Sequence, residues 1–97
     1  MPGIAYETVF IAQPEIPTEQ VDQLIAKVKE TIGVHKGSMI SEDRWGRRRL
    51  AYPIEHFRDG TYVQVNFRSA PQALRELERN IKLAEDVLRY MLIRQGT

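Results

Sequence analysis

A run of three arginines, Arg47 to Arg49, stands directly before the apolar segment Leu50-Ala51-Tyr52-Pro53-Ile54. The guanidinium group is planar and always charged, and it can bind a phosphate through two parallel hydrogen bonds. On an extended segment, Arg47 and Arg49 point to one side and Arg48 to the other. Packing of the apolar residues would hold the arginines rigidly, so the segment predicts positioned contacts with phosphate.

A solvated run of charge is the alternative interpretation, because Glu42 and Asp43 stand close by and could balance the arginines. The chain has a net charge of only +1, from 14 lysines and arginines against 13 acidic residues. The overall field is therefore weak, and an anionic partner must be bound by a local patch.

Residue types that serve catalysis and metal binding occur in the chain, but their spacing suits neither. His35 and His56 have no ligand-like spacing to a carboxylate, which favours surface or capping roles. Three serines stand without a recognisable base: Ser38, Ser41 and Ser69. No glycine-rich phosphate loop follows a predicted strand, and the lack of cysteine excludes disulfides and thiolate chemistry. We therefore expect neither enzyme activity nor a cofactor.

Hydrophobic periodicity predicts two helices and four strands. Strands are expected at residues 6–13, from about residue 34 into the arginines, at 61–67 and at 87–94. Helices are expected from residues 17–19 to Gly33, and from Ser69-Ala70-Pro71 onward. Gly46 is a candidate bulge, and Arg58-Asp59-Gly60 is a candidate turn between strands.

The resulting order is β-α-β-β-α-β over a single domain, residues 1–97. This order is typical of the split βαβ, or ferredoxin-like, fold. It is an α+β sandwich of two layers, in which a four-stranded antiparallel sheet carries both helices on one face. No apolar run reaches the ~20 residues that a membrane helix requires, so no membrane association is expected.

The second face of such a sheet is open, and alternation along the strands predicts what lies on it. Its outward residues would form a docking surface for another macromolecule. A glutamate substituted for Val9 or Met91 on this surface is expected to be solvated in the free protein. A loop or tail that covers this face, or a register error of one residue, is the alternative. The residues expected outward are Val9, Ile11, Tyr62, Gln64, Asn66, Arg89, Met91 and Ile93. Those expected toward the helices are Thr8, Phe10, Ala12, Val63, Val65 and Phe67. On the last strand, Leu88, Tyr90 and Leu92 share the side opposite Arg89, Met91 and Ile93.

The segment WGRRRLAYPI, residues 45–54, resembles the most diagnostic segment of the bacterial small-subunit ribosomal protein six family. Supporting similarities are Tyr6-Glu7 before an apolar strand, Gly60-x-Tyr62, and Asp86-Val87-Leu88-Arg89. The resemblance covers about residues 6–94 and implies the same ferredoxin-like fold. It also implies a cytoplasmic, ribosome-bound structural protein without catalysis.

Membership of that family implies binding to the central domain of the small-subunit ribosomal RNA together with small-subunit ribosomal protein eighteen. The isolated chain is expected to be a monomer. The resemblance assigns RNA binding to Arg47, Arg48, Arg49, Tyr62, Arg89 and Met91, and we add Arg94. We assign partner binding to Val9, Ile11, Arg48, Leu50 and Ile93. Two other functions stay open: a module that self-associates through its open sheet face, and, with less support, a small ferredoxin-like enzyme.

Overall fold

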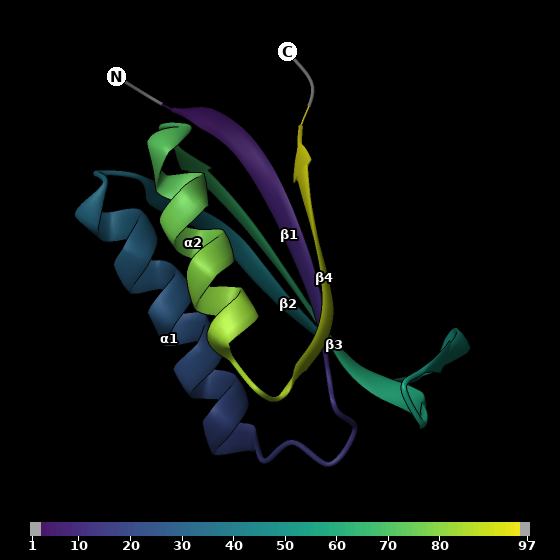
Figure 1. Cartoon of the computed structure of the whole chain (residues 1–97). Coiled ribbons are helices and arrows are strands. Elements are labelled where there is room, and N and C mark those ends of the chain that lie inside the picture. The colour runs from purple at the N-terminus through teal and green to yellow at the C-terminus, as the bar shows by residue number, and fades with distance from the viewer. Residues whose placement is uncertain (1–2, 96–97) are drawn as a thin grey trace.

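The computed structural model describes residues 3–95 and has the predicted order of elements (Figure 1). The elements are β1 (Ile4–Ala12), α1 (Thr18–Val34), β2 (Ser38–Ile54), β3 (Phe57–Ser69), α2 (Gln72–Leu83) and β4 (Val87–Arg94). The strands form one antiparallel sheet in the order β2-β3-β1-β4. Both helices lie on the same face of this sheet (Figure 1). The predicted ferredoxin-like sandwich is confirmed.

The core lies between the sheet and the helices, and its sheet residues are those that alternation predicted. Phe10, Val63, Val65 and Phe67 are each at most 1% exposed, and Thr8 and Ala12 beside them are fully buried. The helices contribute side chains at helical spacing: Val21, Ile25, Val28 and Ile32 from α1, and Leu77 and Ile81 from α2. Each large apolar side chain buried in this way contributes about 1.5–3 kcal/mol to folding.

Helix α1 ends one residue beyond the predicted stop at Gly33, and its left-handed residue is a lysine. The N–H of Lys36 donates to the carbonyl of Gly33 at 2.9 Å, and the N–H of Gly37 donates to the carbonyl of Ile32 at 2.8 Å. These two bonds form a Schellman motif, which satisfies carbonyls that a helix end leaves free. The motif places Lys36 at φ 64°, where glycine is normally found.

Replacing Lys36 by glycine is therefore expected to raise the free energy of unfolding by roughly 0.5–1 kcal/mol. The substitution removes the cost of about 1–2 kcal/mol that a lysine has in the left-handed conformation. Part of this gain is offset because glycine increases the conformational entropy of the unfolded chain. Urea denaturation measures it. The control is Lys29→Gly at an exposed position inside α1, which should cost about 1 kcal/mol. A loss of stability in both variants would contradict the expected relief at Lys36.

The connection between β2 and β3 differs from the prediction, which placed the turn at Arg58-Asp59-Gly60. The strands continue until Ile54 pairs with Phe57, so the turn consists of Glu55, at φ 55°, and His56. Gly60 lies within β3, where a Cβ would collide with the Cγ2 methyl of Ile11. The glycine thus serves a close approach between β3 and β1 rather than a turn.

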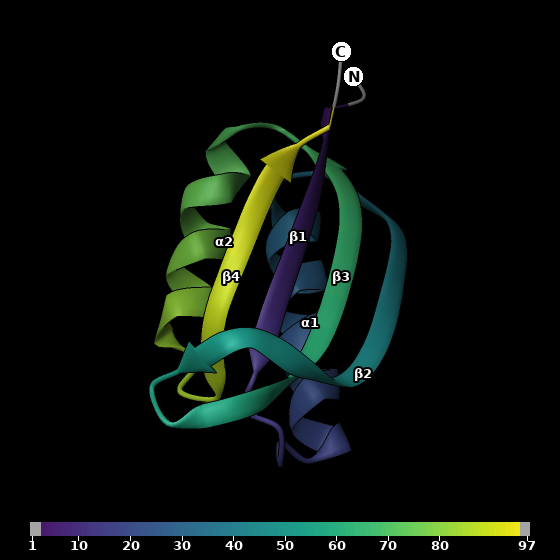
Figure 2. The ribbon, with the colours of Figure 1, turned by 90° about the vertical axis from the view of Figure 1, so that its right-hand side faces the viewer.

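Residues 47–60, which we call the arm, extend the hairpin beyond the end of β1. The last residue of β1 in the ladder, Ala12, pairs with Thr61, so the strand residues of the arm have no partner in β1. Figure 2 shows the arm crossing in front of β1 and β4 on the face away from the helices. Leu50 is only 8% exposed, and it lies beside Gly60, which also approaches Ile11 and the carbonyl of Ala12. The second face is therefore not open over its whole length, because the ends of β2 and β3, and not a loop or the tail, cover it at this end of the sheet.

A bulge changes the start of β4. Ile11 pairs with Arg89 but the next residue, Ala12, pairs with Val87, which leaves Leu88 outside the ladder. Val87 packs against the core together with Tyr90 and Leu92. The prediction that Leu88 shares a side with Tyr90 and Leu92 was wrong, because the extra residue shifts the alternation.

Candidate functional site

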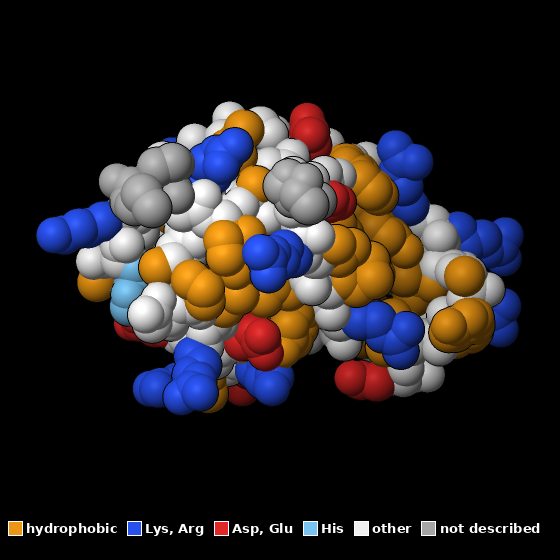
Figure 3. Space-filling view, turned by 90° about the horizontal axis from the view of Figure 1, so that it is seen from above, with side chains coloured by type: hydrophobic (Ala, Val, Ile, Leu, Met, Phe, Trp, Pro, Cys, Tyr) orange, Lys and Arg blue, Asp and Glu red, His pale blue; other side chains and the backbone are white. Residues whose placement is uncertain are grey.

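The open face of the sheet carries the residues that alternation assigned to it. Opposite residues of an antiparallel pair share a face, so the ladders define rows across the sheet. Three rows run across β3, β1 and β4: Asn66–Glu7–Ile93, Gln64–Val9–Met91 and Tyr62–Ile11–Arg89. In the view from above, hydrophobic side chains gather on the side of the sheet away from the helices, and Lys and Arg flank them (Figure 3).

Exposure divides this face into a covered part and a free part. Met91 and Ile93 are 52% and 45% exposed. Val9 is only 6% exposed, because Gln64 and Met91 flank it on the same face. Leu50 is also buried, since it packs within the arm beside Gly60. The expectations that Val9 is solvated and that Leu50 offers surface to a partner are therefore wrong in the described chain.

An aromatic stack that the sequence interpretation did not single out lies beside this surface. The rings of Trp45 and Tyr62 are 5.8 Å apart and tilted by 6°, and Trp45 is 41% exposed. Trp45 is the extra residue of a bulge, since Arg44 pairs with Val63 and Gly46, at φ 82°, pairs with Tyr62. The predicted bulge at Gly46 is confirmed. Because a bulge shifts the alternation of side chains, the glycine in the sequence could have indicated that Trp45 lies on the same side of the sheet as Tyr62.

Arg48 is oriented by this stack. Its guanidinium carbon lies 5.6 Å from the centre of the Trp45 ring, a cation–π contact worth about 0.5–1 kcal/mol at an exposed site. Arg48 pairs with Gly60, two residues from Tyr62 on the same strand, and thus lies on the open-face side. It forms no ion pair within residues 3–95. The ring therefore positions the charge without neutralising it.

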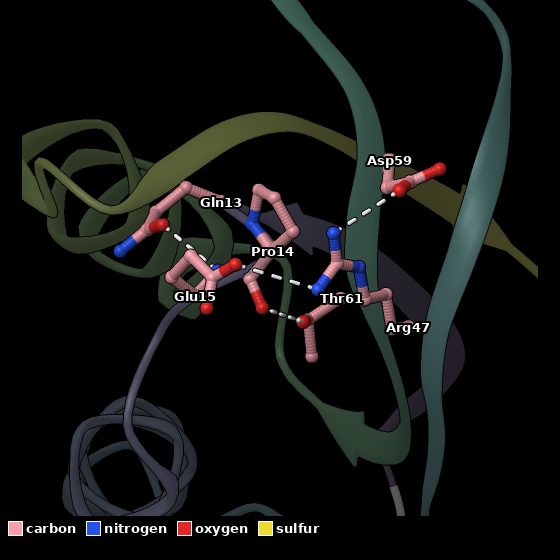
Figure 4. A network of polar contacts seen from close by, with 6 residues as sticks. All are labelled: Gln13, Pro14, Glu15, Arg47, Asp59 and Thr61. Atoms are coloured by element: carbon pink, nitrogen blue, oxygen red, sulfur yellow. Dashed lines mark hydrogen bonds and ion pairs between the residues drawn. The ribbon is translucent and has the colours of Figure 1, made fainter.

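Arg47 is engaged within the chain. Its two terminal nitrogens lie 3.4 Å from Glu15 and 3.2 Å from Asp59 (Figure 4). Beside this network, the hydroxyl of Thr61 donates to the carbonyl of Pro14 at 3.4 Å. These contacts join the base of the arm to the loop that precedes α1. The structure therefore places Arg47 in an internal network, away from the open face.

The acidic residues before the arginines do not balance the run. Arg44 binds Asp22 of α1 at 2.7 Å and Glu42 at 3.4 Å. The hydrogen bond with Asp22 raises the pKa of Arg44 above its ordinary value, with further support from Glu42. The alternative interpretation named Glu42 and Asp43 as counterions of Arg47 to Arg49, yet the counterions of Arg47 come from distant segments.

The remaining predicted residues lie elsewhere. Arg94 pairs with Tyr6, a buried core residue, so Arg94 lies on the helix side of the sheet. Arg49 pairs with Asp59 and by alternation lies on the side opposite Arg48. The predicted set is thus divided, and the members that share the open face without being buried there are Ile11, Arg48, Tyr62, Arg89, Met91 and Ile93.

Both histidines and Ser69 have partners of other kinds. His35 lies 2.8 Å from Glu76, His56 stacks on Phe57, and the Ser69 hydroxyl donates to the carbonyl of Ala70. Within residues 3–95 no three His, Cys, Asp or Glu side chains are grouped so that they could hold a metal ion. Neither helix is long and apolar enough to span a membrane, as far as the described chain extends.

Comparison with known proteins agrees with this architecture. The family model of ribosomal protein S6 matches residues 5–94. The small ribosomal subunit protein bS6 of Desulforamulus reducens is 38% identical over 91 residues, which cover 94% of this chain and 96% of that protein. The bS6 protein of Caldanaerobacter subterraneus is 41% identical over 90 residues, with 93% and 95% covered.

A solved structure is similar as well. The crystal structure of 30S ribosomal protein S6 from Thermotoga maritima superimposes with a TM-score of 0.87 at 32% identity. The match covers 98% of this chain and 89% of that one. Sequence and fold lead to the same conclusion: the chain belongs to the ribosomal protein S6 family of structural proteins of the small ribosomal subunit.

Proposed function

We propose that this chain binds the central domain of the small-subunit ribosomal RNA, and that it does so together with small-subunit ribosomal protein eighteen. As a member of the S6 family it is a structural constituent of the small ribosomal subunit, found with ribosomes in the cytoplasm. The observation that carries the proposal of RNA and partner binding is the open face, where exposed apolar side chains adjoin arginines that have no carboxylate partner within residues 3–95.

The apolar part of this face suits a protein. Met91 and Ile93 each leave about half of the side chain in water, and across the sheet Met91 lies opposite Val9 and Ile93 opposite Glu7. Methionine is a side chain enriched at interfaces and adapts its shape to a partner. Phosphate gains nothing from such a surface, so protein eighteen is the partner proposed for it.

The basic part suits the RNA backbone. Arg48 and Arg89 form no ion pair within residues 3–95, whereas Arg44 and Arg47 are bound to carboxylates. Two unpaired arginines on the same side of the sheet can bind successive phosphates at the edge of the partner protein. Tyr62 lies between them and adds an amphipathic ring.

We also propose that the isolated chain is a monomer. A stable interface buries about 800 Å² on each partner. The arm already covers one end of the open face, which reduces the apolar surface that a second copy could bury. Sedimentation velocity measures the state directly. A stable dimer that does not bind the RNA fragment would favour the self-associating module instead.

Replacing Arg48 and Arg89 together by alanine is expected to weaken assembly with the RNA fragment and protein eighteen. Each phosphate contact that is removed should reduce the steepness of the plot of log K against log salt by about 0.7–0.9. Titrations at several salt concentrations measure both the affinity and the slope. The matched control is Arg75→Ala with Arg79→Ala, which removes the same charge from exposed positions of α2. Equal slopes in the two double variants would refute the role of the open face in RNA binding.

A further inference from the structure

The arm contains a hollow that the proposed interface does not use. Between the pairs Arg49–Asp59 and Ile54–Phe57, four residues of β2 lie opposite the single residue Arg58 of β3. We call residues 50–53 the bow. Because two strands of unequal length are joined at both ends, the longer one must bend away. The resulting hollow has a volume of about 200 Å³ and is lined by the bow, Arg49 and Arg58.

The hollow is electropositive. Arg49 and Arg58 approach it from the two strands, both are exposed, and neither forms an ion pair within residues 3–95. The arm holds four arginines against two carboxylates, Glu55 and Asp59, and Asp59 is bound to Arg47. In a chain of net charge +1, positive charge is therefore concentrated on this projection.

The hollow also offers an aromatic ring and free backbone groups. Tyr52 lines it and is 65% exposed, which is unusual for an aromatic side chain in a folded domain. Residues of the bow have no partner in the ladder of β3, so the N–H groups of Ala51 and Tyr52 are not used there. Pro53 has no N–H to satisfy, which suits this break in the ladder.

We infer that the hollow binds one nucleotide of single-stranded RNA. Arg49 and Arg58 bind its phosphate by charge-assisted hydrogen bonds from two sides, and the Tyr52 ring stacks on the unpaired base beside it. A paired base is already stacked within its helix and cannot stack on Tyr52, so the site prefers a single strand. The inference rests on the proposed function and adds to it a second RNA contact, on the arm.

The test uses the full chain and a short fluorescein-labelled oligouridylate, followed by fluorescence anisotropy over a series of salt concentrations. Arg58→Ala should reduce the salt slope by about 0.7, the value for one single-strand phosphate contact. Tyr52→Leu should weaken binding about tenfold or more, whereas Tyr52→Phe should retain affinity because the ring is kept. Arg75→Ala on α2 is the charge-matched control and should leave binding unchanged.

Amide NMR spectra locate the contact. The oligouridylate should shift the signals of Ala51 and Tyr52, and an RNA duplex should shift them less at equal concentration. An unchanged salt slope in Arg58→Ala, or equal affinity in Tyr52→Leu, would overturn the inference. So would arm variants that weaken binding of protein eighteen but not of RNA, which would make the hollow a protein site.

The open-face variant separates the two ideas. If Arg48→Ala with Arg89→Ala weakens assembly on the RNA fragment while the arm variants do not, the nucleotide site fails and the proposed function stands. If the arm variants and the open-face variant all bind as the unsubstituted chain does, both fail.

Discussion

Val9→Glu is expected to lower the free energy of unfolding by roughly 3–5 kcal/mol, the cost of a buried charge without a partner. Met91→Glu is expected to leave the fold intact. The two residues are direct neighbours across β1 and β4 on the same face of the sheet. Their exposed fractions are 6% and 52%, so a carboxylate would be desolvated at the first position and hydrated at the second.

Chemical denaturation of both variants measures this difference. Burial should raise the pKa of the new carboxyl at position 9 above the ~4.3 of a free glutamate. The folded state then binds a proton more tightly than the unfolded state, so the destabilisation should shrink as the pH falls toward 4 and grow as it rises. Val9→Ala separates the loss of packing from the charge, since its effect should not depend on pH.

The same pair separates folding from assembly. Met91→Glu should weaken joint binding with protein eighteen and RNA although its stability is normal, because it places a charge in the apolar part of the proposed interface. Normal stability of Val9→Glu would show that the open face rearranges to hydrate position 9. Normal assembly by Met91→Glu would show that protein eighteen does not bind at β4.

Binding to the central-domain RNA fragment is expected to be tighter in the presence of protein eighteen by about 1–3 kcal/mol, or roughly 5–150-fold. The chain carries a net charge of +1, and carboxylates within the domain already bind Arg44 and Arg47. Of the arginines assigned to RNA, only Arg48 and Arg89 lie on the open face, compared with the ~6–10 phosphate contacts of strongly salt-dependent nucleic-acid-binding proteins. Apolar contacts at Met91 and Ile93, which a protein can make, should supply the rest.

Isothermal titration into the RNA fragment, with and without protein eighteen, measures this coupling. Linkage requires that the RNA strengthen the binding of protein eighteen to this chain by the same factor, which provides an internal check. Met91→Glu should reduce the coupling while leaving the weak affinity of the chain alone for RNA unchanged. Equal affinity in the two titrations would mean that the chain binds RNA on its own account.

The sequence by itself determined the order of elements and the core. The alternation of Val63, Val65 and Phe67 in β3, and the helical spacing from Val21 to Ile32, depend only on neighbours in the chain. A strand or helix must bury one face, so a local pattern decides which side chains turn inward. The same reasoning placed Met91 and Ile93 on the open face, and the bulge at Gly46 followed from a single glycine.

Only the tertiary structure decided what each arginine does and which outward residues stay free. Arg47 forms an ion pair with Glu15, which lies in a loop far away in the sequence. Arg48 lies over the ring of Trp45, the extra residue of a bulge. Val9 is buried between Gln64 and Met91, and Leu50 is buried beside Gly60, and no local pattern encodes these contacts between strands. Gly60 looked like a turn residue, but the side chain that it accommodates is that of Ile11. Alternation gives the direction of a side chain; its exposure and its partners depend on segments that meet only when the chain has folded.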